Sequence, residues 1–321
     1  MQYKNFLIIQ TAFIGDAILA SSLLEKLHSQ FPQAKISILV RKGSEGLYQN
    51  HPFLHELLVW DKQNDKLKNL IRLLFQIRNN KYNCVVNCHR YASSGLLTAF
   101  SGAKHKAGYK QNPFSFLFNT TIKHDILIGQ HEIERYNQLI EDFTDSSIFK
   151  PKLHASEADI ASVKHLTEKP FICIAPASAW FTKQLPAEKW INLIQHLSPD
   201  QNIYLLGGPS DKDLGENIRA GAKVTNISNL CGTISFLQTY ALMSKAQMNY
   251  VNDSAPLHLA SASNAPVTAY FLSTVPLFGF GPLSDNSTVK EVRTLNCRPC
   301  GIHGFKTCPQ GHFKCGHDMQ V

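Results

Sequence analysis

The sequence predicts an α/β protein built from two doubly wound domains, each with a parallel sheet covered by helices. Its 321 residues are too many for one small domain and suit two of about 150 residues each. In both halves, short β-rich runs alternate with amphipathic helical segments, which is typical of parallel strands joined by right-handed crossovers. Residues 144–158 lose this alternation in a run rich in Asp, Ser, Pro and Lys. We therefore expect domains over 1–150 and 151–321, with a cleft between them.

The N-terminal half begins with a strand–helix–strand unit. Its first β-rich run is followed by a segment in which Ile18, Leu23 and Leu27 share one helical face, and this helix stops before Pro32. The expected strands of this half are 6–10, 35–40, 56–60 and 82–87. The expected helices are 17–30, 65–78 and 131–143.

The C-terminal half repeats the same alternation after the linker. Its expected strands are 171–175, 203–206, 248–251 and 267–271. Its expected helices are 187–196, 211–220, 238–244 and 256–262. Pro186 precedes the first of these helices, and Pro is favoured at the start of a helix because its missing N–H has no helical partner there.

Charge and hydropathy narrow the possible partners and location. The net charge of +8 favours anionic partners such as nucleotides, nucleic acid or acidic membrane surfaces. The chain shows no basic stripe interleaved with aromatic residues, no helix-turn-helix pattern and no arginine-rich tail, so we do not expect nucleic-acid binding. Polar residues interrupt the apolar run at 6–9, and no run of 18 apolar residues follows. We expect a cytoplasmic protein.

The turn after the first strand contains a candidate catalytic carboxylate. Gly15 and Asp16 follow residues 6–10, and ligands of open parallel sheets bind beyond the carboxyl ends of the strands. Asp16 would therefore point into the cleft. Asp is also a preferred N-cap residue, so the spacing alone is equally consistent with a helix cap.

Two segments of the second half could bind phosphate. Residues 176–183 follow the strand at 171–175, and their small residues and Lys183 could let amides and a positive charge approach a phosphate. The alternative without a function is that Lys183 is a solvated surface lysine. Residues 252–258 follow another strand and open a helix, with Asp253 or Ser254 as the cap, so its N-terminal amides suit a diphosphate. His258 could equally be a core histidine with satisfied hydrogen bonds.

The C-terminal tail contains four cysteines with partial zinc-site spacing. Cys297 and Cys300 form a Cys-x-x-Cys pair, followed by Cys308 and Cys315 with His312 between them. A cytosolic disulfide would be unusual, so metal binding is the functional alternative. The six residues between the second pair exceed the usual two to four, which disfavours a structural zinc. The other cysteines are expected in the core: Cys84, Cys88, Cys173 and Cys231.

Taken together, these segments resemble the lipopolysaccharide heptosyltransferases of glycosyltransferase family 9, over nearly the whole chain. Four motifs carry the resemblance in the family's order: Ile14-Gly15-Asp16, Thr182-Lys183 with Pro186-Ala187-Glu188-Lys189-Trp190, residues 252–260, and 278–282 with Gly281-Pro282. The tail around Cys308-Pro309 and Gly311-His312 is also similar to that of many members. No single motif is decisive, but their joint order is specific.

The resemblance implies a GT-B fold, in which two Rossmann-like domains face each other across a cleft. The N-terminal domain would bind the acceptor, with Gly15 on that side, and the C-terminal domain would bind the nucleotide-sugar. Asp16 would act as the general base of an inverting transfer from ADP-heptose to the inner core of lipopolysaccharide. The donor-binding positions that match are Ser178, Thr182, Lys183, Asp253, Ser254, Ala255 and His258, with Asp211 as a contact to the ribose.

The resemblance also implies that no cofactor is required, because positioned cations and amides can stabilise the leaving ADP without a metal. The acceptor would be a saccharide linked to lipid, so the protein would make peripheral contact with the anionic inner face of a Gram-negative inner membrane.

Two departures from the family pattern leave the donor sugar open. Ala255 stands where the family usually has Gly, and its methyl group could crowd a phosphate or disfavour a left-handed backbone. Gln184 and Leu185 replace the usual basic and aromatic residues after Lys183. The alternatives are a transferase for another nucleotide-sugar, a nucleotide-sugar epimerase of the same fold, and a non-catalytic homologue that binds a nucleotide or a lipid.

Overall fold

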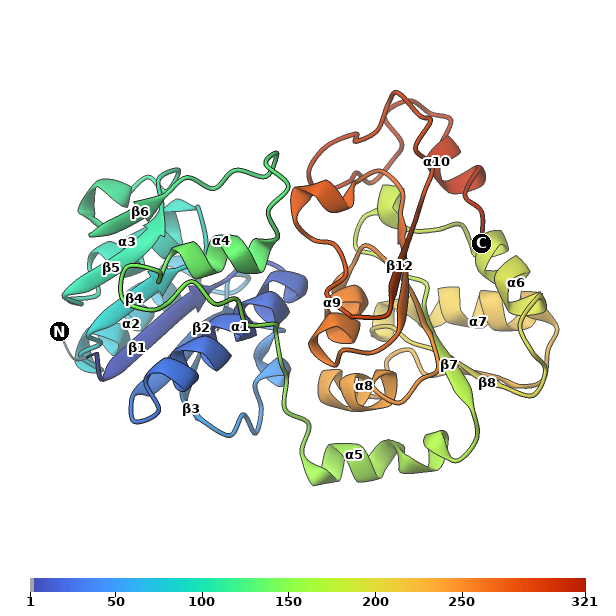
Figure 1. The fold of residues 1–321 in the computed structure, drawn as a ribbon, viewed down its shortest axis with the longest axis horizontal. Coiled ribbons are helices and arrows are strands. Elements are labelled where there is room, and N and C mark those ends of the chain that lie inside the picture. The colour runs from blue at the N-terminus through green and yellow to red at the C-terminus, as the bar shows by residue number, and fades with distance from the viewer. Residues whose placement is uncertain (1–2) are drawn as a thin grey trace. The chain divides into compact units, whose positions relative to one another are not determined.

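The computed structural model describes residues 3–321 and confirms the α/β class. The chain divides into two compact units, one ending at His154 and the other beginning at Ala155 (Figure 1). This boundary lies within 144–158, the segment in which the sequence pattern lapses, although α5 (Glu157–Val163) begins inside that segment. Within residues 3–321, no helix combines the length and the apolar character that crossing a membrane requires.

The N-terminal unit is a six-stranded parallel sheet in the order β3-β2-β1-β4-β5-β6. Its strands are β1 (Asn5–Gln10), β2 (Lys35–Arg41), β3 (Leu54–Trp60), β4 (Cys84–Asn87), β5 (His105–Tyr109) and β6 (Thr120–Ile122). Its helices are α1 (Ile14–Gln30), α2 (Lys66–Asn79), α3 (Ala92–Ala99) and α4 (Glu132–Gln138). The order reverses between β1 and β4, which makes their carboxyl ends the switch point of the sheet.

Helices pack in pairs on the N-terminal sheet: α1 contacts α4, and α2 contacts α3. One buried cluster joins the sheet to α2 and α3, and it includes Leu7, Leu39, Trp60, Leu73 and Leu97. Because apolar side chains from both sheet and helices are removed from water together, this burial is the main force that holds each layer in place.

Some elements of this unit differ from the prediction. The helix expected over 131–143 ends at Gln138, and α3, β5 and β6 were not predicted. These elements are short, and short segments depend on tertiary packing more than on their own propensity. In β5, for example, a side chain on Gly108 would collide with the Phe118 ring, at 2.6 Å. This close approach and the pairing of β5 with β4 and β6 are tertiary features that the local sequence does not reveal.

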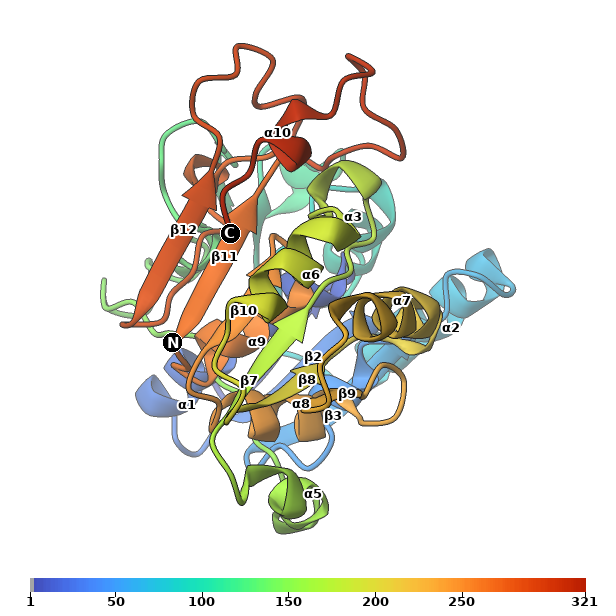
Figure 2. The ribbon, with the colours of Figure 1, turned by 90° about the vertical axis from the view of Figure 1, so that its right-hand side faces the viewer.

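The C-terminal unit has the same sheet topology, with the order β12-β11-β10-β7-β8-β9 and all strands parallel. Its strands are β7 (Phe171–Ala175), β8 (Asn202–Leu205), β9 (Ile227–Asn229), β10 (Asn249–Asn252), β11 (Val267–Phe271) and β12 (Ser287–Glu291). The other helices are α6 (Ala187–Gln195), α7 (Lys212–Ala222), α8 (Phe236–Met243), α9 (Ala255–Ala262) and α10 (Lys314–His317). Figure 2 shows α6 and α7 over one face of the sheet.

The C-terminal tail is part of the core of its unit. After β12 the chain returns to the side of the sheet that α6 covers, where Phe313, Cys315 and Met319 pack in one buried cluster with Trp190 and Leu272. The tail is therefore held by apolar packing, and α10 lies near α6 in Figure 2.

A buried ionic network in the N-terminal unit gives the first prediction. Glu132 in α4 is 3% exposed, and its carboxylate accepts a hydrogen bond from Arg135 Nε at 2.7 Å and lies 3.1 Å from His124 Nε2. Burial opposes ionisation of Glu132, but His124 and Arg135 outweigh it and lower the pKa of this carboxyl group. We expect Glu132→Gln to reduce the free energy of unfolding by about 3 kcal/mol, measured by urea titration at neutral pH.

The same network predicts a pH dependence. A carboxyl group whose pKa is lower in the folded state stabilises the protein above its unfolded pKa of about 4.5, and this contribution is lost as the pH falls. The difference in unfolding free energy between the native protein and Glu132→Gln should therefore shrink below that pH. A difference that stayed constant in acid would show that ionisation of Glu132 is not the stabilising feature.

Candidate active site

The switch point of the N-terminal sheet brings together the turns after β1 and β4. Ile9 pairs with Asn87 at the ends of these strands. Beyond them, the Gln10 amide donates to the Cys88 carbonyl at 3.3 Å, and Thr11 Oγ1 lies 3.2 Å from His89 Nδ1. These contacts hold the two turns together at the carboxyl ends of the strands, where ligands of this fold bind.

Asp16 lies at this edge, in the first turn of α1. The N-cap of α1 is Phe13, and Asp16 is the third helical residue, so the simple N-cap interpretation of Asp16 is wrong. Its carboxylate nevertheless satisfies the helix end, because Oδ2 accepts the Phe13 N–H at 3.2 Å. Asp16 is half-buried, and after burial it is one of the charges that raise the pKa values of Cys88 and Tyr136. The carboxylate therefore lies beside buried groups with limited access to water.

Basic side chains that the sequence did not single out gather at the same switch point. Lys62 donates to the Thr11 carbonyl at 2.5 Å and lies over the Trp60 ring at 4.6 Å. Burial, then Arg41 and Lys66, lowers the pKa of Lys62 to about 8. Arg41 ends β2 and Lys62 follows β3, so only the folded sheet places their positive charges near the turn that precedes Asp16.

His89 is the neutral member of this group. Burial, followed by the charges of Lys62 and Arg90, lowers its pKa to about 3. An imidazole with that pKa is uncharged at neutral pH, so His89 can accept or donate a hydrogen bond near Thr11 without adding positive charge.

The switch point of the C-terminal sheet lies between β7 and β10, where Val251 pairs with Ala175. Asn252, fully buried at the end of β10, connects the turns that follow the two strands. Its amide donates to the Pro176 carbonyl at 2.8 Å, and its Oδ1 accepts the Leu185 N–H at 3.0 Å. The segment 176–185 is thereby held against the start of α9.

Lys183 and Asp253, predicted from separate motifs, meet at this switch point. Lys183 Nζ lies 2.6 Å from Asp253 Oδ2, and their side chains are 15% and 6% exposed. The Thr274 hydroxyl also donates to Asp253 Oδ2, at 2.5 Å. Asp253 therefore fixes the position of the ammonium group. An ammonium has three N–H donors and the pair with Asp253 uses one of them, so Lys183 can also bind an anion.

The start of α9 offers a backbone amide beside this pair. Ser254 is the N-cap, but its side chain makes no capping bond and donates weakly to the Asn252 carbonyl at 3.4 Å. Pro256 has no N–H, and the Leu257 N–H donates to the Ser254 carbonyl at 3.0 Å, so the Ala255 N–H is the first-turn amide that suits a phosphate. Ala255 is the first helical residue and does not have a positive φ, so the expected conflict with a left-handed backbone does not arise. His258 is buried on the same helix.

The remaining predicted donor residues lie along the same edge and hold its turns. The Ser178 N–H donates to Gln184 Oε1 at 3.3 Å, and Leu185 is fully buried. Gln184 and Leu185, the two residues that depart from the family pattern after Lys183, therefore stabilise this loop. Thr182 is buried beside the tail. Asp211 follows β8, and its Oδ2 accepts the Gly208 N–H at 2.8 Å. This hydrogen bond uses Oδ2 to close the turn after β8.

The tail is hydrogen-bonded to the loop that carries Lys183, and the sequence did not predict this contact. Thr182 exchanges two hydrogen bonds with Phe305: its N–H donates to the Phe305 carbonyl at 3.1 Å, and its Oγ1 accepts the Phe305 N–H at 2.8 Å. Arg298, in the Cys-x-x-Cys pair, donates to the Thr274 carbonyl at 2.7 Å. The tail therefore supports both Lys183 and the Thr274 hydroxyl that contacts Asp253.

Gly304 gives a second prediction. It has φ +79°, and a Cβ there would lie 2.9 Å from Lys183 Cγ. If Lys183 binds a phosphate, as its motif predicts, Gly304→Ala should displace the lysine stem and weaken the binding of ADP about tenfold, or about 1.4 kcal/mol, as measured by calorimetry. Gly311→Ala is the matched control, because Gly311 has φ +72° and nothing within 4 Å. Equal effects of the two variants on ADP affinity would contradict the proposed contact with Lys183.

The four tail cysteines approach one another without forming a compact metal site. Burial raises the pKa of Cys300, and the nearby thiols of Cys297 and Cys308 add to this shift. Cys315 is also affected by these thiols, but burial is the main cause that raises its pKa to about 11. Within the described part of the chain, these cysteines do not bring three ligand atoms within 4.8 Å of one another. Zinc at these positions stays a prediction that this geometry does not support.

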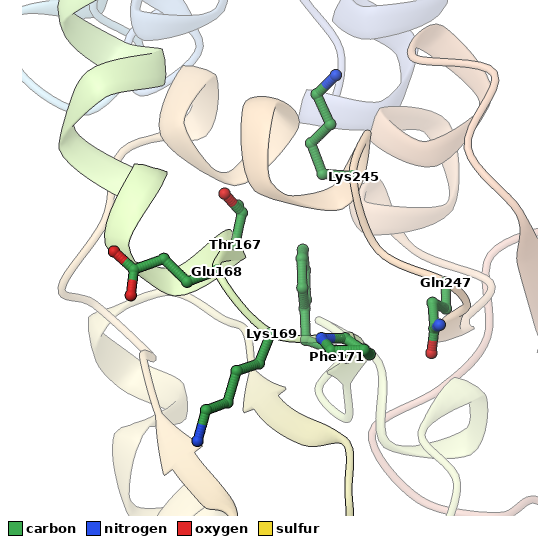
Figure 3. Close-up of a pocket in the computed structure, with 7 residues that line it drawn as sticks. Thr167, Glu168, Lys169, Phe171, Lys245 and Gln247 are labelled. Atoms are coloured by element: carbon green, nitrogen blue, oxygen red, sulfur yellow. The ribbon is translucent and has the colours of Figure 1, made fainter.

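A pocket of about 330 Å³ opens at the opposite edge of the C-terminal sheet. It is lined by Thr167, Glu168, Lys169, Pro170, Phe171, Lys245 and Gln247. These residues precede or begin β7 and β10, so the pocket lies at the amino ends of the strands and not at the switch point. Figure 3 shows the side chains of Lys169 and Lys245 pointing away from each other, so they do not converge on an anion.

Comparison with known proteins agrees with this architecture. Residues 70–307 match glycosyltransferase family 9 (heptosyltransferase). Lipopolysaccharide heptosyltransferase 3 of Escherichia coli K12 is 26% identical over 294 residues, which cover 85% of this chain and 83% of that protein.

Two solved structures have the same fold. A glycosyl transferase of family 9 from Veillonella parvula has a TM-score of 0.80 at 21% identity, over 90% of this chain and 86% of its own. The E. coli ADP-heptose lipopolysaccharide heptosyltransferase II has a TM-score of 0.78 at 21% identity, over 98% of both chains. The two Rossmann-like sheets and these solved structures define the GT-B fold, and the family match defines the protein as a glycosyltransferase. The match over most of its length shows that the chain belongs to glycosyltransferase family 9.

Proposed function

We propose that this protein transfers heptose from ADP-heptose to the inner core of a lipopolysaccharide, with inversion at the anomeric carbon. The observation that carries the proposal is the Lys183–Asp253 pair beside the N-terminus of α9, at the switch point of a family 9 chain. The names of the relatives, which are lipopolysaccharide heptosyltransferases, support the choice of sugar and acceptor.

The C-terminal unit binds the donor. The ammonium group of Lys183 and the Ala255 N–H at the positive end of α9 hold the diphosphate, and they stabilise the negative charge that grows as ADP leaves. Asp253 and Thr274 orient Lys183, and Asp211 is the proposed contact to the ribose. Because these groups supply the positive potential themselves, the transfer step requires no metal.

The N-terminal unit binds the acceptor and supplies the base. The acceptor hydroxyl oxygen attacks the anomeric carbon, the bond from that carbon to the phosphate oxygen breaks, and ADP leaves with the electron pair. The Asp16 carboxylate takes the hydroxyl proton. Lys62, Arg41 and Arg90 add positive charge around this switch point, which suits an anionic acceptor.

The acceptor determines where the protein works. A lipid-linked inner core is presented at the cytoplasmic face of the inner membrane of a Gram-negative cell. The net charge of +8 suits peripheral attraction to that anionic surface. We therefore assign the protein to the cytoplasm, in reversible contact with the membrane.

Calorimetric titration with nucleotides in the presence of a chelator tests the donor assignment. ADP and ADP-heptose should bind, and UDP- and GDP-sugars should bind much more weakly. A preference for a uridine or guanosine donor would overturn the assigned substrate. Absence of binding by every nucleotide would instead favour a non-catalytic homologue, which the presence of both Asp16 and Lys183 argues against.

A transferase for a different sugar is the second candidate. Gln184 removes a cation that the family usually has next to Lys183, and the methyl group of Ala255 lies in the first turn of α9. Both differences fall where the donor diphosphate would lie, so they affect the donor more than the type of reaction. An epimerase would form product from the donor alone, whereas either transferase requires an acceptor.

A further inference from the structure

Two imidazoles and a carboxylate form a compact cluster in the N-terminal unit, outside the proposed active site. Glu25 lies in α1, His51 lies between β2 and β3, and His154 is the last residue of the unit. His154 Nε2 is 2.9 Å from Glu25 Oε1, and one ligand atom of each of the three residues lies within 4.8 Å of the other two. The fold thus gathers three metal-ligating groups from segments that are distant in sequence.

His51 is the member that lacks hydrogen bonds. Its side chain is 8% exposed, and both ring nitrogens are buried and have no hydrogen-bond partner. Its ring packs edge-on against Phe53 at 4.5 Å and against His154 at 4.6 Å, which fixes its position. A buried polar group is costly unless it has a partner, so a ligand that uses one of these nitrogens would satisfy it.

We propose that Glu25, His51 and His154 bind one divalent transition-metal ion of the zinc type. Nitrogen and carboxylate ligands together select such ions, whereas calcium and magnesium prefer sites made of oxygen. Ligand atoms around a tetrahedral zinc lie about 3.3 Å apart, given bonds of about 2.0–2.1 Å, so small side-chain movements would close the site. The ion would replace the hydrogen bond between His154 Nε2 and Glu25 Oε1, the proton of that bond would be released to solvent, and water would complete the coordination of the ion.

This site has a structural role that is separate from the proposed glycosyl transfer. The ion would join α1, the segment before β3 and the end of the unit, and so would stabilise the folded state by binding only to it. Glu25 follows Asp16 by nine helical residues, about 14 Å along α1, so the ion does not take part in the chemistry at Asp16.

Titration of the full-length, metal-free protein with Zn²⁺ tests the proposal, provided that no polyhistidine tag is present. The native chain should bind one equivalent of zinc. In both His51→Gln and Glu25→Gln, this binding should be lost or become at least about 100-fold weaker. His55→Gln is the matched control, because His55 is an exposed histidine in β3 outside the cluster. Zinc should raise the melting temperature of the native and control proteins but not that of the two ligand variants.

Co²⁺ absorption separates this site from the tail cysteines. Nitrogen and oxygen ligands give only weak d–d bands, and these should disappear in Glu25→Gln, which keeps the test valid if His51→Gln does not fold. Failure of the native protein to bind zinc would overturn the proposal. It would also be overturned if only intense thiolate charge-transfer bands appeared, or if both ligand variants bound metal as the native protein does.

Discussion

Replacing Asp16 with Asn is expected to slow glycosyl transfer by about 100- to 10,000-fold while leaving the affinity for ADP unchanged. Asn has the same shape and can still accept the Phe13 N–H, so the start of α1 should persist. It cannot take a proton from the acceptor hydroxyl at neutral pH. Turnover is measured with donor and acceptor, and ADP affinity by calorimetry.

Asp159→Asn provides the matched control for this variant. Asp159 is also the third residue of its helix, and its carboxylate accepts the Ser156 N–H at 2.9 Å. The substitution therefore removes the same type of helix-capping charge without touching a proposed base. Near-native turnover by Asp16→Asn, or an equal loss in both variants, would contradict the assignment of Asp16 as the base.

Replacing Lys183 with Met is expected to have the second largest effect, because it removes the proposed phosphate ligand and leaves a buried carboxylate without its ion pair. The side chain of Asp253 is only 6% exposed, so the uncompensated charge should reduce the free energy of unfolding by about 3 kcal/mol. The affinity for ADP should fall at least tenfold, and turnover should fall with it. Urea titration and calorimetry measure the two effects separately.

The double variant Lys183→Met with Asp253→Asn distinguishes the two roles of the lysine. Asn at 253 can still accept the Thr274 hydroxyl but carries no charge, so most of the lost stability should return. ADP affinity should stay low because the proposed phosphate ligand is still missing. Recovery of ADP binding together with stability would mean that Lys183 only supports the fold.

Much of the fold could be predicted because its central elements are long or fully buried. The runs at 171–175 and 267–271 are buried along their whole length and appear as β7 and β11 with the expected bounds. Strands β6 and β9 have three residues each and lie at the sheet edges, where few apolar residues mark them. Their existence depends on pairing with a neighbouring strand, which a single sequence does not reveal.

The sequence predicted the separate motifs of the candidate site, and the structure shows the contacts between these motifs. Lys183 and Asp253 were each expected near phosphate, but their ion pair depends on the parallel alignment of β7 and β10. Gly304 was not predicted, because its role arises only when the tail folds back against Lys183. Lys62 was missed for the same reason: the sequence shows an ordinary lysine, and only the sheet places it near the turn that precedes Asp16.

Transfer of heptose from ADP-heptose to a lipid-linked inner-core acceptor, followed in the presence of a chelator and below the melting temperature, tests the central proposal most directly. We expect a heptosylated product with inverted anomeric configuration, formed by the native protein and by Asp159→Asn but not at a comparable rate by Asp16→Asn. No product from ADP-heptose, together with transfer from a different nucleotide-sugar, would contradict the proposed function while leaving the family and the fold unchanged.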